Sequence, residues 1–344
     1  MMLALLASCL LSTAQASVPA AEPLVVVTTM PYIADIARSV GGPHVRATAL
    51  IAPGVDPHHV ELTPKQITEL RGADLFLENG MQLEAWAPRV LEASGRRDLA
   101  QGAAAHAFVT NGIAALEIPT EADLAGGGHV HAAGNPHAWL DPRNLKTVAT
   151  NVADALARVR PAERDGFQAR KLAFEKRLDQ AFYGAELEAL VGGRTLERLQ
   201  RGGRLIAFLE SREVDGAALI DRLGGWLGRA RALPTKRLIS YHRTWSYLEA
   251  AFELEIVATL EEKPGIPPGP AYLESLSQLA ADQGVRLVIA PPYYPRVNSE
   301  GFAERIDGVF QVLPTQPGEA EDTFDVFALF DRILDRLEAA GAAR

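Results

Sequence analysis

Cysteine is almost absent from this chain. The 344 residues contain one cysteine, Cys9, which lies in the apolar N-terminal stretch. The rest of the chain therefore has no disulfide and no thiolate metal ligand. A metal site in this protein must be built from histidine, carboxylate, backbone oxygen or water.

An excess of positive charge is also missing. Lys and Arg total 34 against 43 Asp and Glu, which gives a formal charge of -9 and argues against a nucleic-acid partner. Hydrophobic residues make up 48% of the chain, as expected for a soluble globular protein. The length is sufficient for two domains, each with its own core.

Long apolar runs are confined to the N-terminus. Residues 1–16 are apolar and end in Ala14-Gln15-Ala16, a small-x-small pattern that predicts a secretory signal peptide and a periplasmic location. Leu6-Ala7-Ser8-Cys9 also resembles a lipoprotein cleavage box, so anchoring through Cys9 is the alternative. Ordinary cleavage is favoured because the apolar run continues past Cys9. No other run reaches the length that spans a bilayer.

Several catalytic signatures are missing as well. The chain contains no Gly-rich phosphate loop, no HExxH zinc helix and no GxSxG elbow. What remains is a regular alternation of strands and helices, which predicts an α/β fold with mostly parallel sheets.

This alternation occurs in two blocks, and we expect two lobes. In the first block the expected strands are 24–29, 45–51 and 74–77, and the expected helices are 31–40, a run from Pro64 capped by Thr63, and 83–93. In the second block the expected strands are 237–241, 255–260, 285–290 and 309–313, with helices at 245–253, 272–283, 299–306 and 324–337.

A helical region separates the two blocks. Asp141 is expected to cap it, with Pro142 at its first position and a break at Pro161. The segment 192–236 predicts only short elements. The resulting division is a signal peptide at 1–16, a first lobe at 23–140, a connecting region at 141–190 and a second lobe at 191–344.

Three histidines stand at comparable places. His58 follows Asp56-Pro57, His137 follows Asn135-Pro136, and His242 lies just past the carboxyl end of the expected strand 237–241. Proline stiffens the first two turns and lowers the entropy cost of holding a ligand. Taken singly, each is more simply a loop or core histidine. Together they support the hypothesis that all three rings meet on one metal ion between the lobes.

Other side chains have weaker claims to a role. His129 and His131 lie in a Gly-rich loop and either capture metal for the inner site or are simply solvated. His59 is expected to face solvent, with a role as spare ligand as the alternative. Glu84 is expected to be an exposed helix carboxylate, with support of a ligand histidine as the alternative. His44 and His106 are assigned to surface or structure.

The motifs together resemble the zinc- and manganese-type substrate-binding proteins of ABC transporters, a group that includes ZnuA- and TroA-like proteins. The resemblance is carried by the block 54–58 followed by Leu62-Thr63-Pro64, by the stretch 135–142, and by Tyr241-His242 with Tyr247. It implies two α/β lobes joined by one long helix that begins at Asp141, with metal in the cleft between them. It also implies His58, His137 and His242 as ligands, delivery to a membrane permease, and no enzymatic chemistry.

The chain departs from this family where a fourth, carboxylate ligand is expected. The two places read Ala290-Pro291-Pro292 and Val312-Leu313-Pro314. Three imidazoles leave zinc one position short of a tetrahedron, which water or a carboxylate such as Glu261 would fill. The missing carboxylate favours Zn²⁺ over Mn²⁺, since manganese prefers oxygen ligands.

The expected function is therefore that of a monomeric periplasmic protein that captures Zn²⁺ and delivers it to an ABC importer permease. Two alternatives come from other classes. A three-His zinc with an open position is also the layout of a zinc-dependent hydrolase or hydratase, although no general base is evident. A metal-binding adhesin is the other alternative.

Overall fold

The computed structural model describes residues 22–61, 63–121, 131–263 and 265–342. The predicted signal peptide at 1–16, Cys9 and His129 lie outside these described residues. Within the described part of the chain, no helix combines the length and the apolar character needed to cross a membrane.

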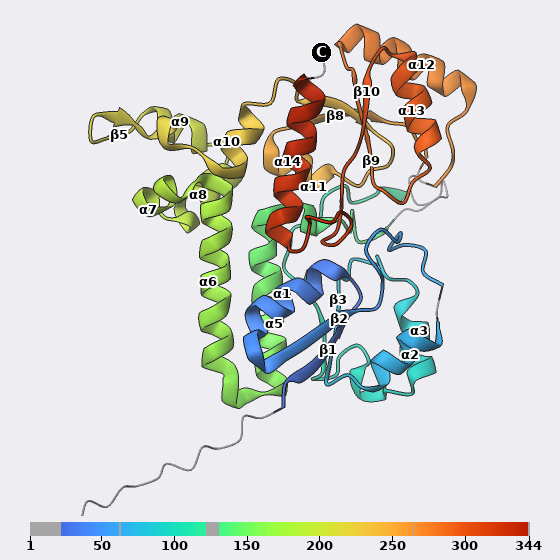
Figure 1. Cartoon of the computed structure of the whole chain (residues 1–344), viewed down its shortest axis with the longest axis vertical. Helices are drawn as coiled ribbons and strands as arrows, with labels where there is room; N and C mark the ends of the chain where they lie inside the picture. Colours follow the sequence, from blue (N-terminus) through green and yellow to red (C-terminus); the bar gives the residue numbers. More distant parts are fainter. Residues whose placement is uncertain (1–21, 62, 122–130, 264, 343–344) are drawn as a thin grey trace, which may run out of the picture.

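The first lobe is built on a four-stranded parallel sheet (Figure 1). Its strands are β1 (Leu24–Thr28), β2 (Val45–Ala49), β3 (Leu75–Glu78) and β4 (His106–Phe108), in the spatial order β2-β1-β3-β4. Every residue of β3 is buried, as in a parallel strand covered on both faces. Sequence analysis predicted the first three strands and missed β4, which has only three residues.

The second lobe repeats this topology. Strands β7 (Arg237–Ser240), β8 (Glu255–Thr259), β9 (Leu287–Ala290) and β10 (Val309–Val312) form a parallel sheet in the order β10-β9-β7-β8. In both lobes the first strand lies between the second and the third, and the fourth strand is at the edge. The prediction of two α/β lobes with mostly parallel sheets is confirmed.

Helices of the first lobe begin where the local sequence favours them. Pro31 and Pro64 open α1 (Pro31–Gly41) and α2 (Pro64–Arg71), and Thr63 forms a reciprocal capping box with Gln66. Helix α3 (Ala87–Ser94) starts four residues later than predicted. Residues 83–86 form turns instead, in which the Leu83 N–H donates to the carbonyl of Gly80 and the Ala87 N–H donates to the carbonyl of Glu84. Met81 and Gln82, just before them, have positive φ angles of 54° and 64°. The short 3-10 helices are η1 (Gly42–His44) and η2 (Arg97–Leu99).

Two helices make up the connecting region, with three 3-10 turns beside them. Asp141 caps the first turn through the Arg143 N–H, as predicted, but α5 then packs against α1 and β4 within the first lobe. The chain reverses at Pro161, and α6 carries it to the second lobe over 20 residues, or about 30 Å (Figure 1). The bridging helix is therefore α6, and the run that begins at Asp141 is not the bridge. The elements are η3 (Ala138–Leu140), η4 (Pro142–Asn144), α5 (Leu145–Val159), η5 (Pro161–Glu163) and α6 (Arg164–Tyr183).

After α6 the chain makes a closed excursion, residues 185–223, that we term the side arm. The backbone N–H of Gly224 donates to the carbonyl of Tyr183, so the arm leaves and returns at one point. It projects away from both sheets (Figure 1) and accounts for most of the segment predicted as short elements. Its elements are α7 (Ala185–Val191), α8 (Gly193–Arg201), α9 (Leu205–Glu210), β5 (Glu213–Val214), β6 (Ala217–Ala218) and η6 (Leu219–Arg222).

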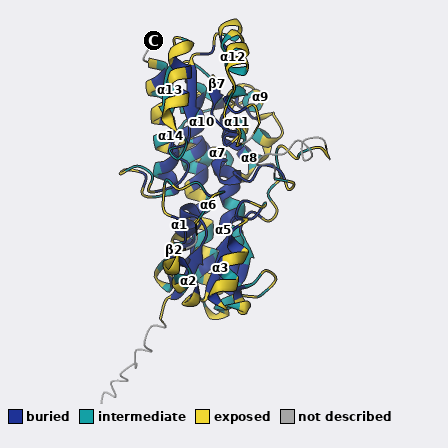
Figure 2. Cartoon of the chain, turned by 90° about the vertical axis from the view of Figure 1, so that its right-hand side faces the viewer, coloured by how far each residue is buried: buried dark blue, intermediate teal, exposed yellow. Residues whose placement is uncertain are grey.

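The remaining helices belong to the second lobe. They are α10 (Gly225–Arg231), α11 (Ser246–Phe252), α12 (Pro270–Gln283), α13 (Arg296–Arg305) and α14 (Val326–Ala342). Helix α10 packs against α6 and α14. Figure 2 shows buried residues inside both lobes and exposed residues on the outer helix faces. Helix α14 is longer than predicted and inserts Phe327, Phe330 and Leu334 into the core. The proposed boundaries at 140, 190 and 191 stay predictions.

Candidate metal centre

His58 lies in the loop between β2 and α2, and Asp56 fixes its position. One carboxylate oxygen of Asp56, Oδ1, accepts the backbone N–H of His58 at 3.0 Å and lies 2.9 Å from the ring Nδ1. Pro57 between them limits the backbone, so the aspartate reaches both groups at once. The ring is thereby oriented through Nδ1, which leaves Nε2 as the nitrogen available for a metal.

His137 is held in the same way. Oδ1 of Asn135 accepts the backbone N–H of His137 at 3.0 Å and lies 2.8 Å from the ring Nδ1. The shared Asx-Pro-His pattern is therefore a structural unit in which the first residue orients the third. Sequence analysis noted the proline and missed the role of Asp56 and Asn135, although the pattern is visible in the sequence.

His242 comes from the second lobe, just beyond the carboxyl end of β7. Its Nδ1 lies 2.8 Å from Oε2 of Glu261, which follows β8. The ring of Tyr294 stacks on it with centroids 5.8 Å apart. Glu261, the candidate fourth ligand, thus lies on the ring nitrogen that faces away from a metal bound at Nε2.

The three rings lie close together where the lobes meet. The His58 centroid is 5.2 Å from that of His137 and 6.1 Å from that of His242, and the latter two are 6.2 Å apart. Nε2 of His58 and of His137 are buried without a hydrogen-bond partner. A buried polar atom in this state is rare and calls for a ligand that the protein itself does not supply.

A fourth histidine joins them. The His131 ring lies 5.2 Å from that of His58, which is the same separation as between His58 and His137. His59, the other alternative, is exposed and borders a separate groove with Val55 and Phe324. His131 therefore lies beside the other three histidines, whereas the sequence analysis expected it in an outer loop that either captures metal or is solvated.

The electrostatics favour neutral imidazole. Burial lowers the pKa of His137 well below its usual range, and the neighbouring His58, His242 and His131 lower it further. Burial alone would raise the pKa of Asp56, but its hydrogen bond and charge interaction with His58 bring the net pKa below the ordinary value. Neutral imidazole is the form that binds a metal.

The two places where the resemblance led us to expect a carboxylate ligand make other contacts here. After β9, Tyr294 packs on His242. After β10, the carbonyl of Thr315 accepts the indole N–H of Trp139, and Glu319 accepts the backbone N–H groups of Thr315 and Gly54. These contacts join the second lobe to the loop that leads to His58.

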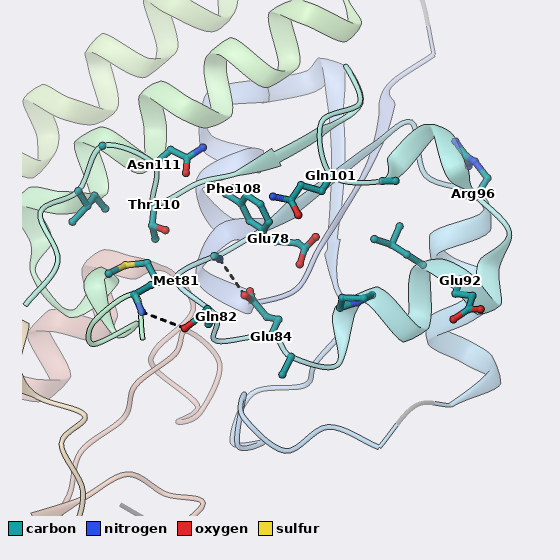
Figure 3. Close-up of a pocket in the computed structure, with 18 of the residues that line it drawn as sticks. Glu78, Met81, Gln82, Glu84, Glu92, Arg96, Gln101, Phe108, Thr110 and Asn111 are labelled. Carbon is teal, nitrogen blue, oxygen red and sulfur yellow. Dashed lines mark hydrogen bonds between the residues drawn. The ribbon is translucent and has the colours of Figure 1, made fainter. Parts of the chain in front are cut away.

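Behind the cluster, Glu84 is buried, which corrects the prediction of an exposed carboxylate. It accepts hydrogen bonds from the Thr29 hydroxyl and from the backbone N–H group of Asn79. It also accepts one from the backbone N–H group of Gly80, which Figure 3 shows as a dashed line. The Asn79 amide in turn donates to the carbonyl of Pro136, next to His137. Burial raises the pKa of Glu84 to about 7, and the charge of Glu78 contributes to this shift.

A cavity of about 1230 Å³ lies next to Glu84, which is one of its lining residues (Figure 3). Glu78 lines it and pairs with the buried His106 at 2.7 Å, so His106 has a structural role. The backbone N–H of Ala133 donates to Gln82 at its rim. None of His58, His137 and His242 lines this cavity, so it is distinct from the histidine cluster.

The described residues do not contain three or more His, Cys, Asp or Glu side chains already arranged as a metal shell. Around a tetrahedral zinc with Zn–N bonds of about 2.1 Å, imidazole centroids lie about 5.2 Å apart. The pairs that include His58 with His137 and with His131 match that spacing. The His242 ring lies roughly 1 Å farther from both His58 and His137 than this spacing.

Comparison with known proteins agrees with the fold. The family described as zinc-uptake complex component A, periplasmic, matches residues 26–186 and 217–340, which is most of the chain. The chain therefore belongs to this family of solute-binding proteins, which are not enzymes. The expectation of a non-enzymatic protein is confirmed, and the hydrolase alternative is set aside. The unmatched residues between the two segments lie in the side arm.

Relatives with different metals in their names align with this chain. It is 31% identical to the iron-binding protein YfeA of Yersinia pestis over 158 residues, or 46% of each chain. It is 22% identical to the high-affinity zinc uptake protein ZnuA of Bacillus subtilis over 307 residues, covering 88% of this chain and 82% of that protein. For the first six relatives, the match spans only about half of their length.

Solved structures share the architecture. A crystal structure of ZnuA superimposes with a TM-score of 0.66 at 20% identity and covers 93% of this chain and all of that one. A manganese-bound periplasmic metal-binding protein from Candidatus Liberibacter asiaticus gives 0.63 at 15% identity and covers 92% of this chain and 99% of that one. At these identities the likeness concerns the fold alone.

Proposed function

We propose that this protein captures one Zn²⁺ ion between its lobes and delivers it to the permease of an ABC importer. The observation that carries the proposal is the meeting of His58, His137 and His242. Each ring is oriented through Nδ1 by an oxygen acceptor, and the three come from two lobes. This is the arrangement in which outer hydrogen bonds orient histidine ligands toward a shared metal.

His131 is our candidate for the fourth ligand. Its separation from His58 matches the spacing expected around a tetrahedral zinc. Glu261 instead holds the Nδ1 side of His242, where it strengthens the ring as a ligand without contacting the metal. A shell of four imidazoles suits zinc better than manganese, which prefers oxygen.

The transport role follows from the family. The names of its relatives include metal-binding lipoproteins of ABC transporters, and we extend that role to this chain as a periplasmic, monomeric partner of a permease. Ligands drawn from both lobes let metal binding set the distance between the lobes. A permease can then recognise the loaded form.

The test is metal stoichiometry and affinity of the purified protein. We expect one Zn²⁺ per chain, with tighter binding of Zn²⁺ than of Mn²⁺ in competition. His58→Ala, His137→Ala and His242→Ala should each weaken zinc at least 100-fold, His131→Ala less, and the control His44→Ala not at all. Tighter manganese binding would reject the metal assignment, and unchanged affinity in H137A would reject the site.

Transport is tested separately in cells. Removal of the gene should abolish high-affinity zinc uptake, and the H242A variant should fail to restore it while H44A succeeds. Normal uptake without the protein would reject the importer role and favour a surface-bound metal protein such as an adhesin.

A further inference from the structure

The Asn135 side chain contacts both ligand-bearing lobes at the candidate site. Its Oδ1 orients His137, as described above. Its Nδ2 donates to the carbonyl of Arg243 at 2.7 Å and to Oε2 of Glu117 at 2.8 Å. The amide orientation is determined by its partners, because the nitrogen faces these two acceptors and the Ser246 hydroxyl at 3.3 Å, and the oxygen faces an N–H.

Arg243 directly follows His242 in the chain. The Asn135 amide therefore links the His137 ring to the backbone beside His242 through two consecutive hydrogen bonds. Tyr247, four residues farther along, strengthens this joint: its hydroxyl lies 3.2 Å from the carbonyl of Asn135 and accepts the N–H of Leu116 at 3.1 Å. Asn135 is only 7% exposed, so these bonds are shielded from water.

The other Asx-Pro-His unit provides an internal comparison. Asp56 orients His58 with a carboxylate, so a carboxylate is sufficient to hold a ligand ring in this geometry. A carboxylate cannot donate a hydrogen bond, whereas an amide can. The difference between the two units is the set of acceptors that the Asn135 amide nitrogen faces: the Arg243 carbonyl, Glu117 and, at 3.3 Å, the Ser246 hydroxyl. Among these, the Arg243 carbonyl has no proton of its own to give, so it requires a donor such as the amide.

We propose that Asn135 is a positioning residue that couples the His137 ring to the His242 segment of the opposite lobe. The amide nitrogen, which donates to the second lobe, slows release of the metal, in addition to the amide oxygen, which orients His137. This proposal rests on the zinc site proposed above. It adds a link that fixes the position of His137 relative to His242.

The deciding variant is Asn135→Asp, which keeps the shape and the acceptor but removes the donor. A residue that acted only on His137 would leave zinc affinity unchanged or tighter in N135D, because a carboxylate makes the ring a stronger ligand. The coupling role predicts the opposite sign, with zinc binding weaker by about 10- to 100-fold. The loss should appear as faster zinc release to a chelator, while the metal-free thermal midpoint stays within a few degrees of wild type.

Charge repulsion between the new carboxylate and Glu117 must be separated from the lost donor. Glu117→Gln alone should stay within about threefold of wild type, because its amide oxygen still accepts from Asn135. The double variant N135D/E117Q removes the repulsion but not the unsatisfied Arg243 carbonyl. It should bind zinc at least tenfold more weakly than E117Q, and recovery to the E117Q value would overturn the coupling.

Two safeguards keep the test decisive. If N135D does not fold, Glu117→Ala serves instead, because it removes one of the partners that hold the amide, and it should speed zinc release several-fold. Unchanged release in E117A would overturn the proposal. Failure of the wild-type protein to bind zinc would reject the proposed function, whereas zinc-binding wild type with unimpaired N135D would reject the role of Asn135 alone.

Discussion

At the scale of single residues, the histidine cluster depends on acceptors that hold the rings. Asp56, Asn135 and Glu261 each occupy the Nδ1 side of one ring. The histidines themselves were foreseeable from their sequence context and the family pattern. Asp56 and Asn135 stand two places before their histidines and were equally visible, but their role depends on a turn in which the side chain reaches past the proline. Glu261 was noted, yet its bond to His242 depends on how β7 and β8 pair and cannot be read from spacing.

Glu84 holds Asn79, which in turn bonds to Pro136 next to His137, and replacement of Glu84 should lower the stability of the fold. In Glu84→Gln one acceptor oxygen becomes an NH₂ group that faces an N–H donor, either that of Gly80 or that of Asn79. We expect the free energy of unfolding to fall by about 1–3 kcal/mol at pH 5, where the raised pKa keeps Glu84 protonated in the folded protein and the substitution removes no buried charge. Chemical denaturation measures this. The exposed Glu92→Gln on the same cavity wall should change stability by less than about 0.5 kcal/mol, and an equal effect in both variants would refute the role of Glu84.

Asp35 introduces a pH dependence of stability. Burial raises its pKa from 3.8 to about 6, although the Val326 N–H and Arg38 oppose this shift. The folded protein therefore binds the proton more tightly than the unfolded chain. The stabilisation is complete below about pH 4 and is lost as the pH rises through about 6.

Asp35→Asn should remove this dependence in the metal-free protein. The amide oxygen still accepts the Val326 N–H, and no charge remains to be buried. Relative to wild type, the variant should gain up to about 3 kcal/mol between pH 4 and pH 7. Denaturant unfolding across this range tests it, and parallel curves for the two proteins would contradict the assignment.

At the scale of elements, most strands and helices were predictable because their periodicity and capping residues are local. Thr63-Pro64 and Asp141-Pro142 mark helix starts that the structure confirms. Strand β4 was missed because three residues carry too little pattern. The bridge was assigned to the wrong helix because the reversal at Pro161 is a tertiary feature: α5 and α6 are both continuous helical patterns in the sequence, and packing alone decides which of them spans the lobes.

The side arm is an addition to the fold, and the metal site should not need it. The chain enters and leaves it at Tyr183 and Gly224, which are hydrogen-bonded at 3.1 Å. Replacement of residues 186–222 by two glycines should therefore preserve zinc affinity within about threefold while lowering thermal stability, because buried leucines such as Leu187 and Leu196 are lost. Zinc titration and thermal unfolding measure the two effects. Loss of zinc binding in a folded deletion variant would show that the arm contributes to the site.

At the scale of the whole molecule, two lobes of equal topology meet at the histidines. The fold was predictable from the alternation of elements and from the family resemblance. The close approach of rings as distant in sequence as His58 and His242 does not follow from the pattern of either lobe alone. It depends on interlobe contacts such as the bond from Trp139 to Thr315 and the bond from Val326 to Asp35.

Zinc should stabilise this arrangement as a whole. A ligand that binds only the folded state at 100 times its Kd adds about 2.7 kcal/mol to the free energy of unfolding. We expect a thermal shift of several degrees in wild type, removed by EDTA, absent in H242A and retained in H44A. A shift that persists in H242A would place the metal elsewhere.

The central claim is that imidazoles of both lobes hold one ion. X-ray absorption of the zinc-loaded protein tests it most directly, because imidazole ligands give a distinct scattering pattern. Our account predicts at least three imidazole nitrogens at about 2.0–2.1 Å, with one fewer in H242A. A first shell made mostly of oxygen, or one unchanged in H242A, would contradict it.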